Sequence, residues 1–276
     1  MFAVLFSLIL IFIIFYHMKI LFTKYHGTGN DFVMIDDRSE SFDEANVKLV
    51  EAICSRRFGV GADGLILLRN EQGYDFKMVY FNSNGRQSSM CGNGGRCLVH
   101  FASSLDVFKE KCKFLAIDGD HLGEVLENGT VKLKMGVVDN ISRDGNDFVL
   151  DTGSPHYVQS VESVFDKNVK LDGAAIRYSD QYKSVGINVN FINLNDSILN
   201  VATYERGVED ETYSCGTGVT ASALVAHQVY GSVSPVAINT KGGSLSVHFQ
   251  KTDIGYSNIW LEGPVVKVFD GVWPQE

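Results

Sequence analysis

Proline and cysteine are both scarce in this chain, and each shortage excludes a class of structure. Only 4 of the 276 residues are proline, against 27 glycines, so the chain is rich in turns and poor in rigid linkers. The five cysteines are an odd number and are sparse for this length. That usage is typical of free thiols in a reducing compartment and not of a secreted disulfide scaffold. We therefore expect a cytoplasmic protein.

Positive charge is also in short supply. The chain has 24 lysines and arginines against 33 aspartates and glutamates, which gives a formal net charge of -9. A nucleic-acid-binding protein needs a basic face, so we predict no nucleic-acid partner. A hydrophobic content of 45% with 21% charged residues describes a globular protein, and 276 residues are enough for two domains of ordinary size.

Motifs for metals and nucleotides are missing. Cys91 and Cys97 are six positions apart, outside the spacing of two to four that is typical of structural zinc ligands, and no suitably spaced pair of histidines accompanies them. No glycine-rich turn ends in Gly-Lys-Ser/Thr or has the Rossmann spacing of glycines. The sequence therefore predicts no metal site. Cys54, Cys97 and Cys112 are interpreted as packing residues.

The first residues differ from the rest of the chain, because residues 2–16 are almost wholly apolar. As a helix, this stretch would span about 22 Å, short of the roughly 30 Å of a membrane's hydrocarbon core. It also lacks the basic region and the Ala-x-Ala-like cleavage site of a secretory signal. Translated upstream sequence, a weak membrane anchor and a signal peptide all stay open as interpretations. We expect residues 1–17 to be an extension outside the working fold, which begins at Met18 and needs no membrane.

Apolar and polar residues alternate in many short segments along the rest of the chain, which is typical of β-strands joined by tight turns. Helical character is found in fewer places, within 41–57, 96–104 and 220–230. Strands are predicted at 20–25, 32–36, 63–68, 76–82, 114–117, 123–127, 131–135, 148–152, 156–161, 187–194, 198–205, 236–240, 245–249 and 259–261. We predict an α+β fold in which each half of the chain is a curved antiparallel sheet that holds one helix.

Two short turns of the form Cys-Gly-x-Gly each precede a helical segment. One begins at Cys91 and the other at Cys215. A glycine-bearing turn that opens a helix leaves backbone N–H groups unpaired at the positive end of the helix dipole, which lowers a thiol pKa and can also hold a carboxylate. The N–H groups in question belong to Gly92, Asn93, Gly216 and Thr217.

Two such cysteines, in corresponding places of two half-chains, suggest an acid and a base that act on opposite faces of one carbon. One thiolate would remove a proton and one thiol would return it, and like-charge repulsion in a narrow site favours that singly ionised pair. Such a pair suits the inversion of a carbon next to a carboxylate, whose growing negative charge the N–H groups would stabilise. The alternative is that Cys91 and Cys215 are buried thiols at tight turns.

Three motifs in register carry a resemblance to a known family. They are His-Gly-Thr-Gly-Asn-Asp-Phe at 26–32, Cys-Gly-Asn-Gly-Gly-Arg-Cys at 91–97, and Glu-Arg-Gly at 205–207 followed by Cys-Gly-Thr-Gly at 215–218. From Met18 nearly to its end, the chain resembles diaminopimelate epimerase. The resemblance implies a cofactor-independent isomerase, working without pyridoxal phosphate, that interconverts LL- and meso-2,6-diaminoheptanedioate in the biosynthesis of lysine and peptidoglycan precursors.

The same resemblance implies an architecture. Two pseudo-symmetric domains would each form a barrel-like antiparallel sheet wrapped around a central helix, with the active site in the cleft between them. The N-terminal domain, carrying Cys91, would comprise residues 18–134 and 264–276. The C-terminal domain, carrying Cys215, would comprise residues 135–263. The chain is also a candidate homodimer.

Position by position, the resemblance gives the site residues their roles. Cys91 and Cys215 would be the two bases, and His156 and Glu205 would tune the thiols. Backbone cradles for the α-carboxylate would lie at Gly92-Asn93 and Gly216-Thr217. The substrate's amino and carboxylate groups would be bound by Asn30, Asn82, Asn188, Glu205 and Arg206. Arg206 suits a dianionic substrate because its fork binds a carboxylate through two hydrogen bonds.

Several of these residues have plainer interpretations that the sequence leaves open. Arg206 could form a surface ion pair with Glu205 or Glu209. His156 could be a structural histidine, and the three asparagines could be ordinary turn amides. Each of these interpretations would remove a substrate contact without touching the pair of thiols.

Two positions depart from the family pattern. Ser154 stands where the family often has asparagine, and Gly64 where some members have glutamine. A side-chain contact at Gly64 is lost, and one at Ser154 stays open. Two other functions also stay open: a related cysteine-pair racemase of the proline type, and a noncatalytic amino-acid-binding protein on the same fold.

Overall fold

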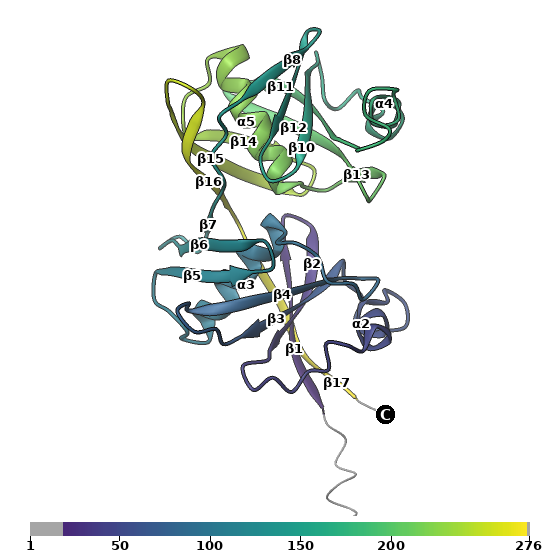
Figure 1. Cartoon of the computed structure of the whole chain (residues 1–276), viewed down its shortest axis with the longest axis vertical. Helices are drawn as coiled ribbons and strands as arrows, with labels where there is room; N and C mark the ends of the chain where they lie inside the picture. The colour runs from purple at the N-terminus through teal and green to yellow at the C-terminus, as the bar shows by residue number, and fades with distance from the viewer. Residues whose placement is uncertain (1–18, 275–276) are drawn as a thin grey trace, which may run out of the picture.

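The computed structural model describes residues 19–274, which form two lobes stacked along the long axis of the molecule (Figure 1). The predicted apolar extension of residues 1–17 and the predicted start at Met18 lie outside the described residues. The lower lobe in Figure 1 contains the helix α3 (Gly92–Ser104), and the upper lobe contains the helix α5 (Gly216–Tyr230). The predicted division into domains at residues 134/135 and 263/264 stays a prediction.

The first lobe runs from β1 to β7 and is completed by the last strand of the described chain. That strand, β17 (Val266–Trp273), pairs antiparallel with β1. The other elements of the lobe are β1 (Ile20–Gly27), β2 (Asn30–Asp36), α2 (Val47–Cys54), β3 (Gly64–Arg69), β4 (Phe76–Asn82), α3, β5 (Lys111–Ala116), β6 (Gly119–Val125) and β7 (Val131–Lys134).

The second lobe holds the elements between β7 and β17. Its last strand, β16, pairs antiparallel with β7, so one ladder joins the two lobes. The elements are β8 (Ile141–Asp144), β9 (Asp147–Asp151), β10 (Pro155–Ser160), α4 (Val169–Arg177), β11 (Asn188–Asn195), β12 (Ile198–Glu205), β13 (Asp210–Thr212), α5, β14 (Val236–Thr240), β15 (Gly243–Lys251) and β16 (Tyr256–Gly263).

The two lobes repeat one pattern of strand pairing. In the first lobe, β1/β2, β3/β4, β5/β6 and β6/β7 are antiparallel, whereas β2/β3 and β4/β5 are parallel. In the second, β9/β10, β11/β12, β14/β15 and β15/β16 are antiparallel, whereas β10/β11 and β12/β14 are parallel. A helix lies between the two strands of every parallel pair, because parallel neighbours require a crossover. The predicted antiparallel sheets therefore contain these four parallel ladders as well.

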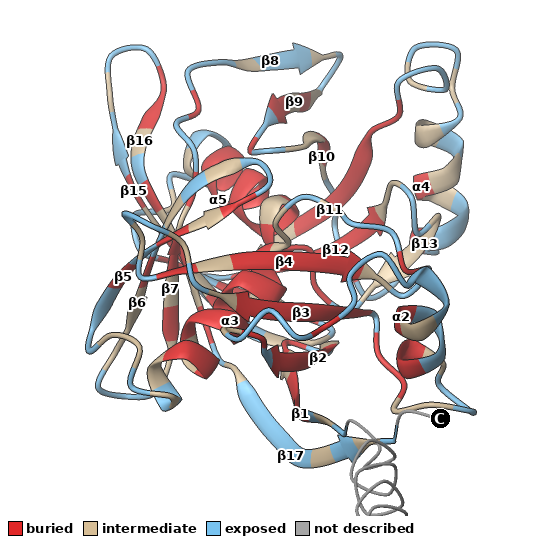
Figure 2. Cartoon of the chain, turned by 60° about the horizontal axis from the view of Figure 1, so that its bottom comes forward, coloured by how far each residue is buried: buried red, intermediate tan, exposed pale blue. Residues whose placement is uncertain are grey.

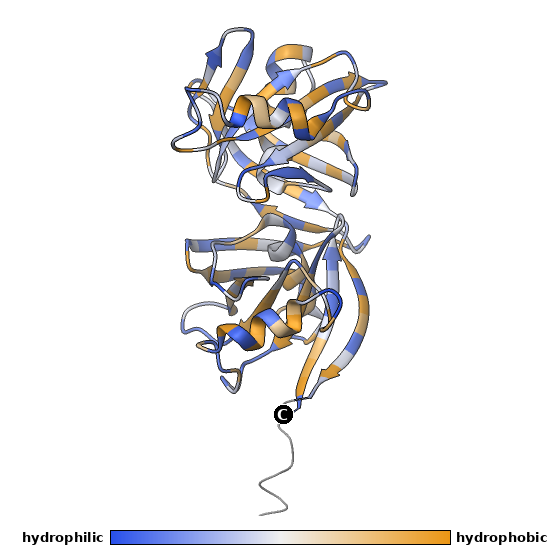
Figure 3. Ribbon diagram, turned by 90° about the vertical axis from the view of Figure 1, so that its right-hand side faces the viewer, coloured by the Kyte–Doolittle hydropathy of each residue, from blue (hydrophilic) through white to orange (hydrophobic). Residues whose placement is uncertain are grey.

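Each long helix is enclosed by apolar side chains of its own lobe. Phe32 and Phe114 belong to the core around α3, and Leu245 and Val247 belong to the core around α5. Figure 2 shows both helices mostly in the colour of buried residues, surrounded by strands. Apolar and polar residues alternate along the strands, which gives the banded colouring in Figure 3. This packing fixes the position of each helix and of the cysteine turn at its start.

Both long helices begin earlier than the sequence predicts. α3 begins at Gly92 and α5 at Gly216, directly after the cysteines, instead of at residues 96 and 220. The side chains of Cys91 and Cys215 make no capping hydrogen bond. The sequence therefore holds no ordinary capping residue that would mark the true start.

The shorter helices also differ from the prediction. α2 covers only part of the predicted 41–57 helix, because Asn46 caps it by accepting a hydrogen bond from the Leu49 N–H at 3.1 Å. Four elements that the sequence does not predict are β8, α4, β13 and β17. In α4, a Cβ at Gly173 would lie 2.4 Å from the Tyr204 Cβ, so the close packing of this helix requires the glycine that weakens its helical pattern.

Candidate active site

A cleft of about 1320 Å³ is lined by residues of both lobes. Asn82 is the last residue of β4 and Glu205 the last residue of β12, so corresponding strand ends of the two lobes contribute to it. Among the residues that line the cleft are all the predicted site residues except His156: Asn30, Asn82, Cys91, Gly92, Asn93, Asn188, Glu205, Arg206, Cys215, Gly216 and Thr217. The fold thus brings one set of residues together from both halves of the chain.

The two cysteines occupy equivalent positions at the starts of the long helices. Cys91 is the N-cap residue of α3 and Cys215 the N-cap residue of α5, and both have extended backbones. The first turns of the helices touch, because a Cβ built on Gly216 would lie 3.4 Å from the Gly92 Cα. Glycine at both positions therefore allows the two cysteine turns to approach each other across the cleft.

The pKa of each thiol is raised, against the expectation from the helix ends. Burial raises the pKa of Cys91, and the backbone N–H groups of Gly94 and Asn93 only partly oppose it. Burial, followed by the charge of Glu205, also raises the pKa of Cys215. The prediction that the helix N-termini lower the thiol pKa values is wrong in its net direction, because desolvation outweighs the N–H groups.

Asn82 is oriented by a residue that the sequence analysis did not select. The Tyr80 hydroxyl donates to Asn82 Oδ1 at 2.8 Å, which leaves the amide nitrogen of Asn82 as a donor. The Tyr80 ring fills the space beside Gly64, where a Cβ would lie 2.5 Å from Tyr80 Cε2. Asn30, which also lines the cleft, has its amide nitrogen 3.6 Å from Cys91 Sγ.

Asn188 uses its side chain within the protein. Its amide nitrogen donates to Ser154 Oγ at 2.9 Å and to the Pro155 carbonyl at 3.0 Å, and its Oδ1 accepts the Arg206 N–H at 2.9 Å. The side chain of Asn188 therefore holds Ser154 and the backbone of Arg206 in place.

The Arg206 guanidinium is held by neutral oxygens. It donates to Ser154 Oγ at 3.3 Å and to the Val185 carbonyl at 3.2 Å. No carboxylate of the described residues forms an ion pair with it, and Glu209 pairs with Arg177 at 3.5 Å instead. Arg206 is therefore a cation at the cleft that is available to an anionic ligand.

Asn93 links the two cysteine turns. Its amide nitrogen donates to the carbonyl of Ser214 at 2.8 Å, and Ser214 directly precedes Cys215. Its Oδ1 accepts a hydrogen bond from Arg96 at 2.9 Å. Both polar atoms of this side chain are therefore engaged within the protein, so the contribution of Asn93 to an anion cradle rests on its backbone N–H.

Glu205 and His156 have different relations to the thiols. Burial raises the pKa of Glu205, whose charge in turn raises the pKa of both Cys91 and Cys215. Burial and the charge of Arg206 lower the pKa of His156 to about 3, so its ring is neutral at pH 7. His156 is fully buried and does not line the cleft, and Asn190 donates to its Nδ1 at 3.0 Å. Its role in tuning the thiols stays a prediction.

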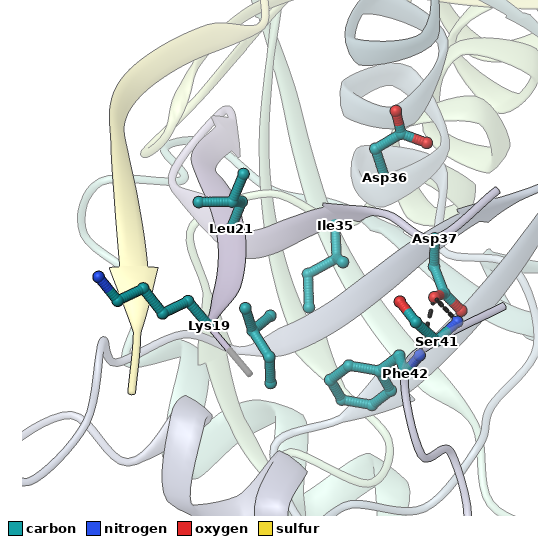
Figure 4. A pocket seen from close by; sticks show the side chains of 8 residues that line it. Lys19, Leu21, Ile35, Asp36, Asp37, Ser41 and Phe42 are labelled. Atoms are coloured by element: carbon teal, nitrogen blue, oxygen red, sulfur yellow. Dashed lines mark hydrogen bonds between the residues drawn. The ribbon is translucent and has the colours of Figure 1, made fainter. Parts of the chain in front are cut away.

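A second, smaller pocket of about 280 Å³ lies beside β1 and β2 (Figure 4). Its acidic groups already have partners: the Asp36 carboxylate pairs with Arg38 at 2.6 Å, and Asp37 Oδ1 accepts the N–H groups of Ser41 and Phe42. Because both carboxylates are satisfied within the protein and none of the predicted site residues lines this pocket, it does not compete with the cleft as a candidate site.

In residues 19–274, no group of three or more histidine, cysteine, aspartate or glutamate side chains is placed to hold a metal ion. No helix in that range is long and apolar enough to cross a bilayer.

The sequence that builds this cleft is shared with known proteins along most of its length. A family model described as diaminopimelate epimerase matches residues 22–141 and 148–268. The chain belongs to the diaminopimelate epimerase family. It is 50% identical over 250 residues to a diaminopimelate epimerase of Flavobacterium psychrophilum, covering 90% of this chain and 97% of the relative. A diaminopimelate epimerase of Aquifex aeolicus is 38% identical over 278 residues, covering 92% and 98% of the two chains.

Solved structures extend the relation at the level of the fold. A phenazine biosynthesis protein of the PhzF family from Bacillus anthracis superposes with a TM-score of 0.72 at 13% identity, covering 92% of this chain and 99% of that one. A hydroxyproline epimerase from Agrobacterium vitis superposes with a TM-score of 0.64 at 12% identity, covering 92% and 91%. The predicted family and the predicted diaminopimelate epimerase-like fold are confirmed.

The epimerase-family motifs did not lead to every residue at this cleft. Tyr80 lies two positions before Asn82 on a buried strand. Aromatic residues are common in such strands, so nothing in the local sequence distinguishes Tyr80 as a site residue. Arg96 lies inside the motif at 91–97 and does not itself line the cleft, and its buried position cannot be read from local sequence.

Proposed function

We propose that this chain epimerises one α-carbon of diaminopimelate, interconverting the LL and meso forms, with Cys91 and Cys215 as the acid and base. The observation that carries the proposal is the pairing of two N-cap cysteines whose helices abut at Gly92 and Gly216 in one cleft. The family relation supports the choice of substrate and the isomerase class. The reaction serves the biosynthesis of lysine and peptidoglycan precursors.

The chemistry needs one thiolate and one thiol. The thiolate takes the α-proton, so a C–H bond breaks, an S–H bond forms and the electron pair of the carbon spreads into the adjacent carboxylate. The opposite thiol then gives its proton to the other face of that carbon and becomes the thiolate. The N–H groups of Gly92, Asn93, Gly216 and Thr217 are proposed to hold the carboxylate on which charge builds. No electrons are gained or lost overall, and the step requires no cofactor.

The raised thiol pKa values fit this pair, because mutual repulsion and Glu205 oppose a doubly ionised state. Arg206 is proposed to bind a second carboxylate of the substrate, at a distance from the backbone cradles. Asn82 is proposed to donate its amide nitrogen to the same substrate, and Asn30 to lie beside the reacting thiol Cys91. In this proposal Asn188 acts through Ser154 and Arg206.

The test is turnover of LL-diaminopimelate in heavy water, with a reductant and without added cofactor. We expect meso product that carries deuterium at the inverted carbon. Cys91→Ala and Cys215→Ala should each lower kcat at least about a thousandfold, because each removes one of two obligatory proton carriers. Exchange of the α-proton of one isomer is expected to survive in each variant, on the side of the base that is retained.

The matched control is Cys112→Ala, which removes a free, buried thiol on β5 outside the cleft. It should turn over at close to the unaltered rate. Full activity after loss of either cleft cysteine would overturn the two-thiol mechanism. An absence of both product and exchange, with turnover of a proline-type substrate, would move the assignment to the related racemases.

We further propose a cytoplasmic location and a homodimer. All five cysteines are free thiols, which are maintained in a reducing compartment. β17 pairs only with β1 among the described strands, so its other edge is open, and the exposed apolar residues Phe269 and Val272 lie on this strand. An open edge with apolar side chains is suited to pairing with a second copy of the chain.

A further inference from the structure

Arg96 is a buried cation whose direct partners are all neutral. Its side chain is 0% exposed and is the largest of the fully buried side chains. The guanidinium donates to Asn93 Oδ1 at 2.9 Å, to Thr28 Oγ1 at 3.3 Å and to the Gly92 carbonyl at 3.3 Å. Its Nε has no hydrogen-bond partner. No carboxylate of the described residues pairs with it.

This placement is unfavourable for the folded protein by itself. A buried charge is normally paired with an opposite charge, because desolvation costs several kcal/mol. Arg96 also lies near the N-terminus of α3, where the helix dipole disfavours a cation. A cation kept at such a position indicates an anion that is present only during function.

The opposite turn makes the same backbone contact without a charge. Thr220 occupies the position in α5 that Arg96 occupies in α3, five residues after the cysteine. Its hydroxyl donates to the Gly216 carbonyl at 2.9 Å, as Arg96 donates to the Gly92 carbonyl. Holding that carbonyl therefore requires only a small neutral donor, and the charge of Arg96 needs another explanation.

We propose that Arg96 is a positioning residue that supplies the countercharge for the Cys91 thiolate, so that the ionised member of the resting pair is Cys91 and not Cys215. This inference rests on the proposed acid/base roles of the two thiols. Through Asn93, the guanidinium is also connected to Ser214, which precedes Cys215. Asn93 thus connects the two cysteine turns through neutral hydrogen bonds, whereas the cation Arg96 belongs to the Cys91 turn alone.

The other titratable groups around the thiols do not favour ionisation of Cys215 over ionisation of Cys91. Glu205, from the end of β12, raises the pKa of both cysteines, and the charge of Cys91 raises the pKa of Cys215. Tyr80, from β4, faces Cys91 as a neutral phenol, because burial raises its pKa. Cys97, which also interacts with Arg96, stays a neutral thiol because burial raises its pKa to about 12. The cation Arg96 acts on Cys91 in the lowering direction, whereas the groups that lower the pKa of Cys215 are neutral donors, the Thr217 hydroxyl at 3.4 Å and the Gly218 N–H.

The experiment measures how the alkylation of each thiol depends on pH. The substrate-free protein is treated with iodoacetamide between pH 6 and 11, and the modified peptides of Cys91 and Cys215 are quantified separately by mass spectrometry. The midpoints are compared, and not the rates, because the two thiols differ in exposure. We expect the Cys91 midpoint to lie below that of Cys215. The reverse order in the unaltered protein would overturn the proposal, whatever any variant does.

Two variants separate charge from packing. Arg96→Gln should raise the Cys91 midpoint by about one pH unit, equivalent to about tenfold less thiolate at a fixed pH, while Arg96→Lys keeps the midpoint near its original value. Thr220→Val is the matched control, because it removes the equivalent contact to the Gly216 carbonyl and no charge. A folded Arg96→Gln protein with an unchanged Cys91 midpoint would contradict the proposal.

The same variants have a readout during turnover. Arg96→Gln should shift the acidic limb of the pH profile of kcat/KM to higher pH, and Arg96→Lys should restore it. The alkylation assay contains no diaminopimelate, so it gives its answer even if the chain acts on a different substrate. A failure of the proposed function and a failure of the Arg96 proposal are therefore distinguishable.

Discussion

At the scale of single residues, the Tyr80 hydroxyl decides which end of the Asn82 amide faces the cleft. Tyr80→Phe would remove the 2.8 Å hydrogen bond to Asn82 Oδ1 and keep the edge-to-face contact between ring 80 and Phe32. We expect KM for diaminopimelate to rise about three- to tenfold with kcat nearly unchanged, because an oriented donor is lost equally in the ground and transition states. Steady-state kinetics would measure both constants.

The matched control for this prediction is Tyr74→Phe. It removes a tyrosine hydroxyl that is bonded to Asp120, away from the cleft. Its KM should stay within error of the original. If Tyr80→Phe also leaves KM unchanged, the hydroxyl does not orient Asn82 for substrate.

Residues inside the sequence motifs could be predicted, but their electrostatics could not. Cys91 and Cys215 stand out because the turn pattern around each is local. The direction of their pKa shifts depends on burial by residues far away in the sequence, so local reasoning about helix ends gives the wrong sign. Arg96 was part of a recognised motif, yet its lack of a carboxylate partner is a property of the folded core alone.

At the scale of elements, the start of α5 is fixed by the absence of a side chain at Gly218. A Cβ there would lie 2.4 Å from Asn190 Oδ1, which accepts the Thr203 hydroxyl. Gly218→Ala should therefore lower the free energy of unfolding by about 1–3 kcal/mol, because the buried amide cannot move without losing its partners. Urea denaturation followed by circular dichroism would measure the loss.

Gly136→Ala is the control for that prediction. No atom of residues 19–274 lies within 4 Å of a Cβ built at Gly136, so its change in stability should stay within about 0.5 kcal/mol. Equal stability of the two variants would mean that the start of α5 tolerates a side chain at position 218, and that close packing is not the reason for glycine there.

The positions of the strands could be predicted more easily than the way in which the strands pair. Alternating apolar residues mark β15 and most other strands, because each strand places one face on the core. The four parallel ladders depend on which strand the chain pairs with after each crossover helix, and no local sequence pattern indicates that. β17 carries mostly exposed residues, so it has no apolar alternation to reveal it.

At the scale of the whole molecule, the active site is a product of the repeated architecture. Each lobe alone has one cysteine turn at the start of one enclosed helix. The contact between Gly92 and Gly216, together with the hydrogen bond from Asn93 to Ser214, turns two such helix ends into a site with a thiol on each side. The two halves share little sequence outside the cysteine turns. The motifs therefore indicate that the halves are related, but only the strand pairing shows that the whole lobes are alike.

The proposed homodimer gives the last prediction. Phe269 on β17 is 47% exposed and contacts Phe22 edge to face, and Val272 on the same strand is 51% exposed. If this edge joins two copies, sedimentation equilibrium should give twice the chain mass of 30.5 kDa, and Phe269→Glu should dissociate the dimer by burying a charge in the interface. Phe165→Glu is the matched control, since Phe165 is 77% exposed on the other lobe and should leave the dimer intact. A monomeric unaltered protein at micromolar concentration would refute the dimer, whereas dissociation by both variants would show that surface charge in general, and not this edge, controls assembly.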